Sequence, residues 1–81
     1  MFCLWKCFKM LRLFIEDNIK GYIDTYDNVY QVEIRKIDKK NYLIIRYNSL
    51  KDDEMILLSE IKLCFLVDIN NMHEYFRYEK K

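Results

Sequence analysis

Three cysteines and a single histidine are the side chains with the most reactive chemistry in this sequence. Cys3, Cys7, Cys64 and His73 supply four groups of the kind that bind zinc in a closed tetrahedral site. Cys3 and Cys7 stand four residues apart, which would place them on one face of a helix, whereas structural zinc usually takes its ligands from tight turns. We therefore expect Cys64 to be a small core residue and His73 a surface residue, and we predict no metal and no cofactor.

A nucleophilic active site would have to be built from Cys64 and His73. No third residue is evident to orient the imidazole, and Cys64 lies in the most apolar run of the chain, where a thiol is buried and inert. The adjacent carboxylates Asp52, Asp53 and Glu54 lie in a polar stretch that is typical of a solvated turn. The chain has one glycine and therefore no Gly-rich phosphate loop. The sequence predicts that this protein is not an enzyme.

Basic and aromatic side chains gather around one predicted hairpin. They are Arg35, Lys36, Lys39, Lys40, Tyr42, Arg46 and Tyr47. Cations bind phosphates and aromatic rings stack on bases, so this pattern suits a single-stranded nucleic acid. However, Asp38 interrupts the cluster and the net charge is only +1. A charged hairpin is also typical of a sheet edge that blocks unwanted strand pairing, and both interpretations stay open.

The N-terminal segment, residues 2–15, is almost wholly apolar apart from cations at every third position. Those cations are Lys6, Lys9 and Arg12. This spacing predicts an amphipathic helix over residues 1–18. A strand over Met10–Ile15 is the competing interpretation, because short apolar runs fit both.

Such a helix could serve the protein in three ways. It could pack across the rest of the domain, which we favour. It could lie on a membrane surface through residues 2–15, with Cys3 and Cys7 as acylation sites. It could also dock on a partner or on a second copy, with Trp5 and Phe8 as contact residues.

The middle of the chain, residues 19–69, predicts an antiparallel β-meander. Alternation of apolar and polar side chains predicts its strands at Ile19–Thr25, Val29–Ile37 and Tyr42–Tyr47. The polar stretches Tyr26–Asn28, Asp38–Asn41 and Asn48–Asp53 predict the turns and loop between and after them.

Two later segments complete the predicted elements. Met55–Val67 splits at Ser59 and Glu60 into a short strand and a longer buried one, with a single helix as the alternative. Asn71, followed by Glu74 three positions later, is typical of a helix N-cap. This pattern predicts a C-terminal helix over residues 70–81, with Met72, Tyr75 and Phe76 facing the core.

Length and composition indicate one folded domain, residues 1–81. The chain is 52% hydrophobic and 16% aromatic, which excludes a disordered chain. The odd number of cysteines and the lack of a signal-peptide cleavage site predict a cytoplasmic protein. The enrichment in Ile, Lys, Asn and Tyr suggests an AT-rich genome, such as that of a low-GC bacterium, a phage or a large DNA virus.

The stretch from Ile34 to Val67 follows a recognisable order of elements. Ile34–Asp38 is a strand end with a basic pair followed by Ile-Asp, and Leu58–Ile61 supplies a polar-acidic turn before the closing strand. This order resembles the YolD-like family of low-GC bacteria, although the Trp-Ile-Pro type run that the family tends to carry before the turn is absent. The resemblance implies an SH3-like barrel and a link to DNA-damage tolerance, and it brings no catalytic residues.

These patterns together predict an α+β fold: a small β-meander or SH3-like barrel of four to five strands with an N-terminal and a C-terminal helix. Seven tyrosines and an apolar excess favour a non-catalytic module that binds a protein. We picture an accessory protein or inhibitor of a phage, virus or mobile element that modulates a host protein in the host cytoplasm. The alternative is a small nucleic-acid-binding barrel that uses residues 35–47, and homodimers fit either interpretation.

Overall fold

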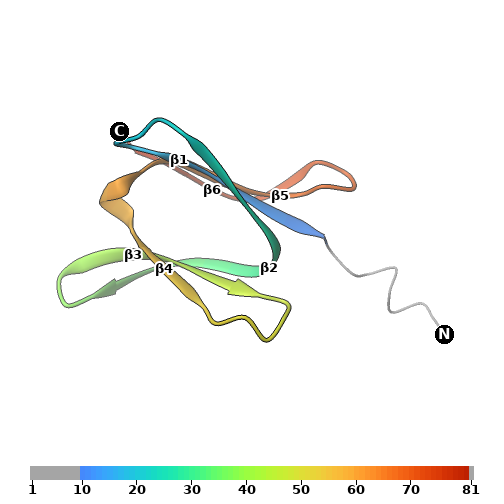
Figure 1. Ribbon diagram of the computed structural model, residues 1–81, viewed down its shortest axis with the longest axis horizontal. Coiled ribbons are helices and arrows are strands. Elements are labelled where there is room, and N and C mark those ends of the chain that lie inside the picture. Colours follow the sequence, from blue (N-terminus) through green and yellow to red (C-terminus); the bar gives the residue numbers. More distant parts are fainter. Residues whose placement is uncertain (1–9, 81) are drawn as a thin grey trace.

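The computed structural model describes residues 10–80, which form one antiparallel sheet of six strands (Figure 1). The strands are β1 (Leu11–Asp17), β2 (Ile23–Ile37), β3 (Lys40–Tyr47), β4 (Glu54–Leu57), β5 (Ile61–Asp68) and β6 (His73–Glu79). A single 3-10 turn, η2 (Leu58–Glu60), joins β4 to β5. The order in the sheet is β4-β3-β2-β1-β5-β6. None of the described residues forms an α-helix, so the predicted α+β fold is wrong, and none forms a helix that could cross a membrane.

The predicted N-terminal helix is replaced by a strand over the part that the structure describes. Leu11, Leu13 and Ile15 are buried in β1, while Arg12 and Phe14 between them are only partly buried. This period of two belongs to a strand and not to a helix. β1 lies between β2 and β5 and pairs with both, so its backbone donors and acceptors are satisfied on either side. The rest of that prediction, together with Trp5, Phe8, Cys3 and Cys7, lies outside the described residues.

The predicted C-terminal helix is also wrong, because residues 73–79 form the edge strand β6. The Asn71 side chain does accept a backbone hydrogen bond, but from His73 N at 2.8 Å, within a turn and not at a helix end. Phe76 pairs with Leu66 and packs against the core. β6 thereby supplies hydrogen-bond partners to β5, whose edge would otherwise be unpaired.

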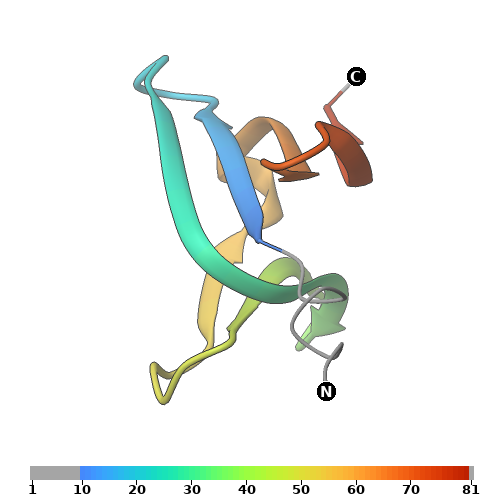
Figure 2. The same ribbon diagram turned by 90° about the vertical axis from the view of Figure 1, so that its right-hand side faces the viewer.

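Strand β2 is a single bent strand where the sequence predicted two strands and a turn. Its first half pairs with β1 and its second half with β3, and Val29 pairs with Leu11 on one side and Tyr47 on the other. The bend lies at Asn28, whose φ of 59° is a left-handed conformation that asparagine tolerates. Asn48 N donates to the Asn28 carbonyl at 2.8 Å and fixes the bend. Figure 2 shows β2 sweeping from one half of the sheet to the other.

The bend in β2 divides the sheet into two halves with the core between them (Figures 1 and 2). One half holds β1, β5 and β6, and the other holds β3 and β4. The buried cluster consists of Leu11, Leu13, Ile15, Val29, Leu43, Ile45, Tyr47, Ile61, Cys64 and Leu66. It draws on every strand except β4 and β6, from which Ile56, Phe76 and Tyr78 pack against it.

Two predictions for the meander are confirmed. Residues 55–67 divide into β4 and β5 at a turn that contains Ser59 and Glu60, and not into a helix. The β2–β3 hairpin turns at Asp38 and Lys39, whose φ values of 50° and 70° are those of the tight hairpin turn that matches strand twist.

Candidate binding surface

The predicted basic hairpin carries its own counter-charges. Glu33 Oε2 accepts from Arg35 Nη2 at 2.9 Å, and Glu33 Oε1 accepts from Arg46 Nη1. Arg46 Nε also lies 3.4 Å from Asp53 Oδ2. The guanidinium of Arg46, helped by that of Arg35, holds the pKa of Glu33 below its usual range. Both arginines are therefore largely neutralised, which weakens them as phosphate ligands.

The structure divides the predicted hairpin residues between the two faces of the sheet. Tyr42 is directly opposite Arg35, and residues opposite each other in an antiparallel pair share a face. Tyr47 points into the core, where it is buried. Lys36 is opposite Asn41, on the face away from Tyr42. The predicted site is thus not one continuous patch.

Tyr47 has a structural role at the end of β3. Its hydroxyl donates to Glu54 Oε1 at 2.6 Å, and Lys51 Nζ lies 4.3 Å from the ring centroid and 3.2 Å from the same carboxylate oxygen. Burial, followed by the bond to Glu54, raises the pKa of Tyr47 well above its usual value. The same hydroxyl, followed by Lys51, lowers the pKa of Glu54. These contacts attach the β3–β4 loop to the core.

Tyr47→Phe should lower the free energy of unfolding by about 1 kcal/mol near neutral pH, because it removes this hydrogen bond to a charged group. The folded pKa of Glu54 is depressed, so its ionisation stabilises the fold above the usual pKa of 4.5, and this stabilisation is lost as the pH falls through the folded value. Urea unfolding at about pH 7 and about pH 3 should show a smaller loss in acid. Tyr42→Phe is the matched control, because none of the side-chain hydrogen bonds among residues 10–80 involves the Tyr42 hydroxyl. Equal losses at both pH values would contradict the assigned role of Glu54.

The one thiol–imidazole pair of the described chain is not assembled. Cys64 pairs with Tyr78, whereas His73 pairs with Asp68, which lies four residues further along β5, or about 13 Å. Cys64 is fully buried, and burial raises the pKa of its thiol to about 11. His73 is exposed and makes an edge contact with the ring of Tyr75. Among residues 10–80, no group of three His, Cys, Asp or Glu side chains could hold a metal ion.

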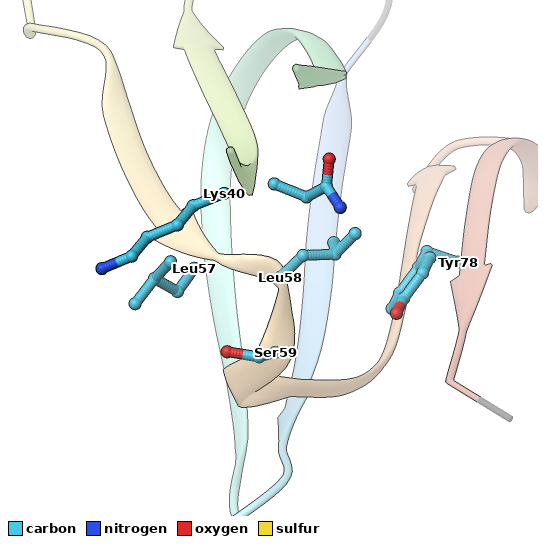
Figure 3. A pocket seen from close by; sticks show the side chains of 6 residues that line it. Lys40, Leu57, Leu58, Ser59 and Tyr78 are labelled. Atoms are coloured by element: carbon cyan, nitrogen blue, oxygen red, sulfur yellow. The ribbon is translucent and has the colours of Figure 1, made fainter. Parts of the chain in front are cut away.

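A pocket of about 430 Å³ opens between the two halves of the sheet (Figure 3). Its lining residues are Lys40, Asn41, Leu57, Leu58, Ser59 and Tyr78. Figure 3 shows Leu58 pointing across the pocket toward Tyr78, while Lys40 and Leu57 lie on the other side of the ribbon. The pocket therefore has apolar walls and one cation at its margin, and its size lies in the range of ligand and side-chain sites.

Four lysines lie in or next to this pocket. Lys40 lines it, and Lys36 shares a face with the lining residue Asn41. Lys39 is at the hairpin tip, and Lys80 Nζ donates to the Ser59 carbonyl at 3.1 Å. The four are Lys36, Lys39, Lys40 and Lys80, and within residues 10–80 none forms an ion pair.

The turn between β1 and β2, together with Ile23 at the start of β2, presents apolar side chains to solvent. Ile19, Tyr22 and Ile23 are 80%, 67% and 64% exposed. The Asp17 carboxylate accepts from the backbone N–H groups of Ile19 and Lys20 at 2.6 and 2.8 Å, and these bonds lower its pKa. The turn is thus held in one conformation although its side chains have no cover.

Hydrogen bonds join this turn to η2. Asn18 N donates to the Glu60 carbonyl at 2.8 Å, and the Asn18 amide reaches the Ser59 carbonyl at 3.4 Å. Gly21, with φ 75°, supplies the left-handed residue that closes the turn. Ser59 therefore both lines the pocket and accepts a hydrogen bond from the turn.

We call this region the end surface: residues 18–23, η2, the pocket residues and the four lysines. Figure 1 places the β1–β2 turn, η2, the β2–β3 turn and the C-terminus at the same end of the molecule. Of the predicted contact residues, Lys36, Lys39 and Lys40 belong to it, whereas Arg35, Tyr42, Arg46 and Tyr47 do not. Ile19 and Tyr22 were predicted to lie in a strand but belong to the turn between β1 and β2, whereas Ile23 is the first residue of β2. The Asp-Asn before Ile19 and the single glycine after it were the signals of a turn.

Comparison with protein-family models, with curated proteins and with solved structures finds no match. The resemblance to the YolD-like family therefore stays a prediction.

Proposed function

We propose that this protein is a small non-catalytic module that binds another protein through its end surface. The observation that carries the proposal is the exposure of Ile19, Tyr22 and Ile23 on a turn whose backbone is fixed by hydrogen bonds. A turn whose backbone is already fixed loses little backbone entropy when a partner covers its side chains. Tyr22 adds a large ring with one polar end, the composition that is enriched at protein interfaces.

The non-catalytic part of the proposal rests on the position of the reactive groups. Cys64 is buried within the core, and His73 lies on another pair of the β5–β6 ladder. Neither can act on the other, and neither lies on the end surface. The end surface instead carries exposed apolar side chains and lysines, which suit binding to a partner.

Nucleic-acid binding has less support than it had from the sequence. Two of the predicted cations, Arg35 and Arg46, share Glu33, and the predicted stacking residue Tyr47 is buried. A single strand needs a row of free cations beside exposed rings. We therefore treat nucleic acid as an alternative outcome of the experiment.

Site-specific photo-crosslinking in the cells that express the protein tests the proposal. A photoreactive phenylalanine analogue replaces Ile19 in one variant and Leu50 in the control. Leu50 is a matched control because it is a fully exposed apolar residue on the β3–β4 loop, at the opposite end of β3 from the hairpin turn. We expect a discrete protein adduct at position 19 that survives nuclease treatment and is missing at position 50.

Three results would contradict the proposal. They are an adduct at position 19 that nuclease removes, equal adducts at both positions, and no adduct at position 19. An adduct with a second copy of the chain would support protein binding and identify the partner as a homodimer. Ile19→Asp should abolish the adducts that a crosslinker at the exposed Tyr22 forms, while Leu50→Asp should leave them unchanged.

A further inference from the structure

The pocket on the end surface combines apolar walls with an excess of positive charge. Leu57, Leu58 and the ring of Tyr78 line it, and all three are only partly buried. The carboxylates next to these four lysines in the sequence or at η2 are those of Asp38, Glu60 and Glu79, and all three are exposed. The local charge is therefore positive although the whole chain carries only +1.

The lysines are available because their neighbours do not neutralise them. Lys62, on β5, lies 3.7 Å from Glu16, and Lys51 lies 3.2 Å from Glu54. By contrast, neither Lys36 nor Lys40 forms an ion pair with any of residues 10–80. Unpaired cations at the rim of an apolar pocket raise the rate and the selectivity of binding to an anion.

From this combination we infer that the pocket binds an acidic segment of the protein partner, anchored by one large apolar side chain between Leu58 and Tyr78. The inference rests on the proposed function and names the chemistry of the partner. The apolar side chain removes the walls of the pocket from water. A carboxylate on one side of this anchor lies against Lys36, which shares the face of Asn41, and a carboxylate on the other side lies against Lys40 at the opposite margin. Lys80 supplies a further cation beside Ser59.

A nucleic acid fits this pocket less well than an acidic peptide. Its charge lies on a continuous backbone, which a pocket with leucine walls cannot solvate. Its bases need exposed rings, and Tyr78 is partly buried in the wall of the pocket. The lysines and the apolar walls of the pocket are therefore complementary to a peptide in which carboxylates flank apolar side chains.

Fluorescence anisotropy with defined peptides tests the inference. The probe is a labelled peptide, Glu-Asp-Leu-Phe-Asp-Glu. One control peptide carries Gln and Asn in place of the acids, and another carries Ser in place of Leu and Phe. We expect each control peptide to bind at least about tenfold more weakly than the probe in low salt, and the affinity for the probe to fall as salt increases.

Variants of the protein assign the binding to this pocket. The double charge reversal Lys36→Glu with Lys40→Glu should weaken probe binding by about tenfold or more. Lys62→Glu, which changes one ion-paired lysine outside the pocket, should change it by less than about twofold. Ser59→Trp should block the pocket, since Ser59 is exposed on η2 and lines it. Urea midpoints of all variants establish that each is folded before binding is compared.

The inference is overturned if the amide peptide binds as well as the probe, or if the double charge reversal leaves binding unchanged. It is also overturned if a short oligodeoxythymidine binds more tightly than the probe and loses affinity in the same double variant. A crosslinked protein adduct at position 19 together with no probe binding would refute the acidic segment and leave the proposed function standing. If neither the protein adduct at position 19 nor binding of the probe peptide is found, both the proposed function and the acidic segment are refuted.

Discussion

Leu13→Ala should lower the free energy of unfolding by about 3 kcal/mol, a large share of the total stability of so small a domain. Leu13 is completely buried in the middle of β1. It pairs with Tyr26 on β2 and with Leu66 on β5, so the cavity left by the truncation is bounded by strands on both sides. The neighbouring strands cannot collapse into it without breaking their own pairing, so we expect most of the cavity to remain.

Urea unfolding followed by fluorescence measures this loss as a lower midpoint with an unchanged slope. Ile19→Ala is the control, because Ile19 is 80% exposed and its truncation should change stability by less than about 0.5 kcal/mol. The observed strand places Leu13 within the buried cluster. Equal midpoints for the two variants would contradict the placement of β1.

The period of β1 was hard to read from its sequence because Phe14 joins Leu13 and Ile15 in one apolar run. Leu11, Leu13 and Ile15 face the core, whereas the other face carries Phe14 between the charged Arg12 and Glu16. Phe14 stacks on Phe65 with ring centroids 5.0 Å apart, and a short apolar run of this kind fits a helix as well as a strand. The strand alternative over Met10–Ile15 was the correct one for residues 11–15.

The error at β6 has a different origin. Asn71 behaves as a side-chain acceptor, as the sequence indicated, but the same chemistry serves a turn and a helix cap. What decides between them is β5, whose free edge pairs with residues 73–79. That choice depends on a tertiary contact, which local spacing does not contain.

Part of the binding surface was predictable, and part was not. The hairpin with Lys36, Lys39 and Lys40 was correctly located, and all three lysines belong to the end surface. The pocket was not predictable, because its walls come from β4, η2 and β6, which are distant in sequence.

A chain that ends at Asn70 should lose cooperative unfolding altogether. Without β6, the edge of β5 is unpaired, and the inner side chains Cys64 and Leu66 lose their neighbours Tyr78 and Phe76. The lost burial and ladder hydrogen bonds amount to about 5 kcal/mol or more, comparable with the whole stability of a domain this small. Thermal unfolding by circular dichroism should therefore show a broad slope and not a transition. A chain that ends at Glu79 is the control, since it loses Lys80 and its bonds to the Lys62 and Ser59 carbonyls but keeps the strand.

A sharp transition for the chain that ends at Asn70, with the midpoint of the intact protein, would contradict the pairing of β6. Amide hydrogen exchange on the intact chain distinguishes the edge strand from the predicted helix more directly. Lys80 N donates to the Lys62 carbonyl, so the alternate amides of Tyr78 and Phe76 should also face β5 and exchange slowly. Those of Arg77 and Glu79 point away from the sheet and should exchange fast. A helix would protect all of these amides alike, because each donates to the carbonyl four residues before it.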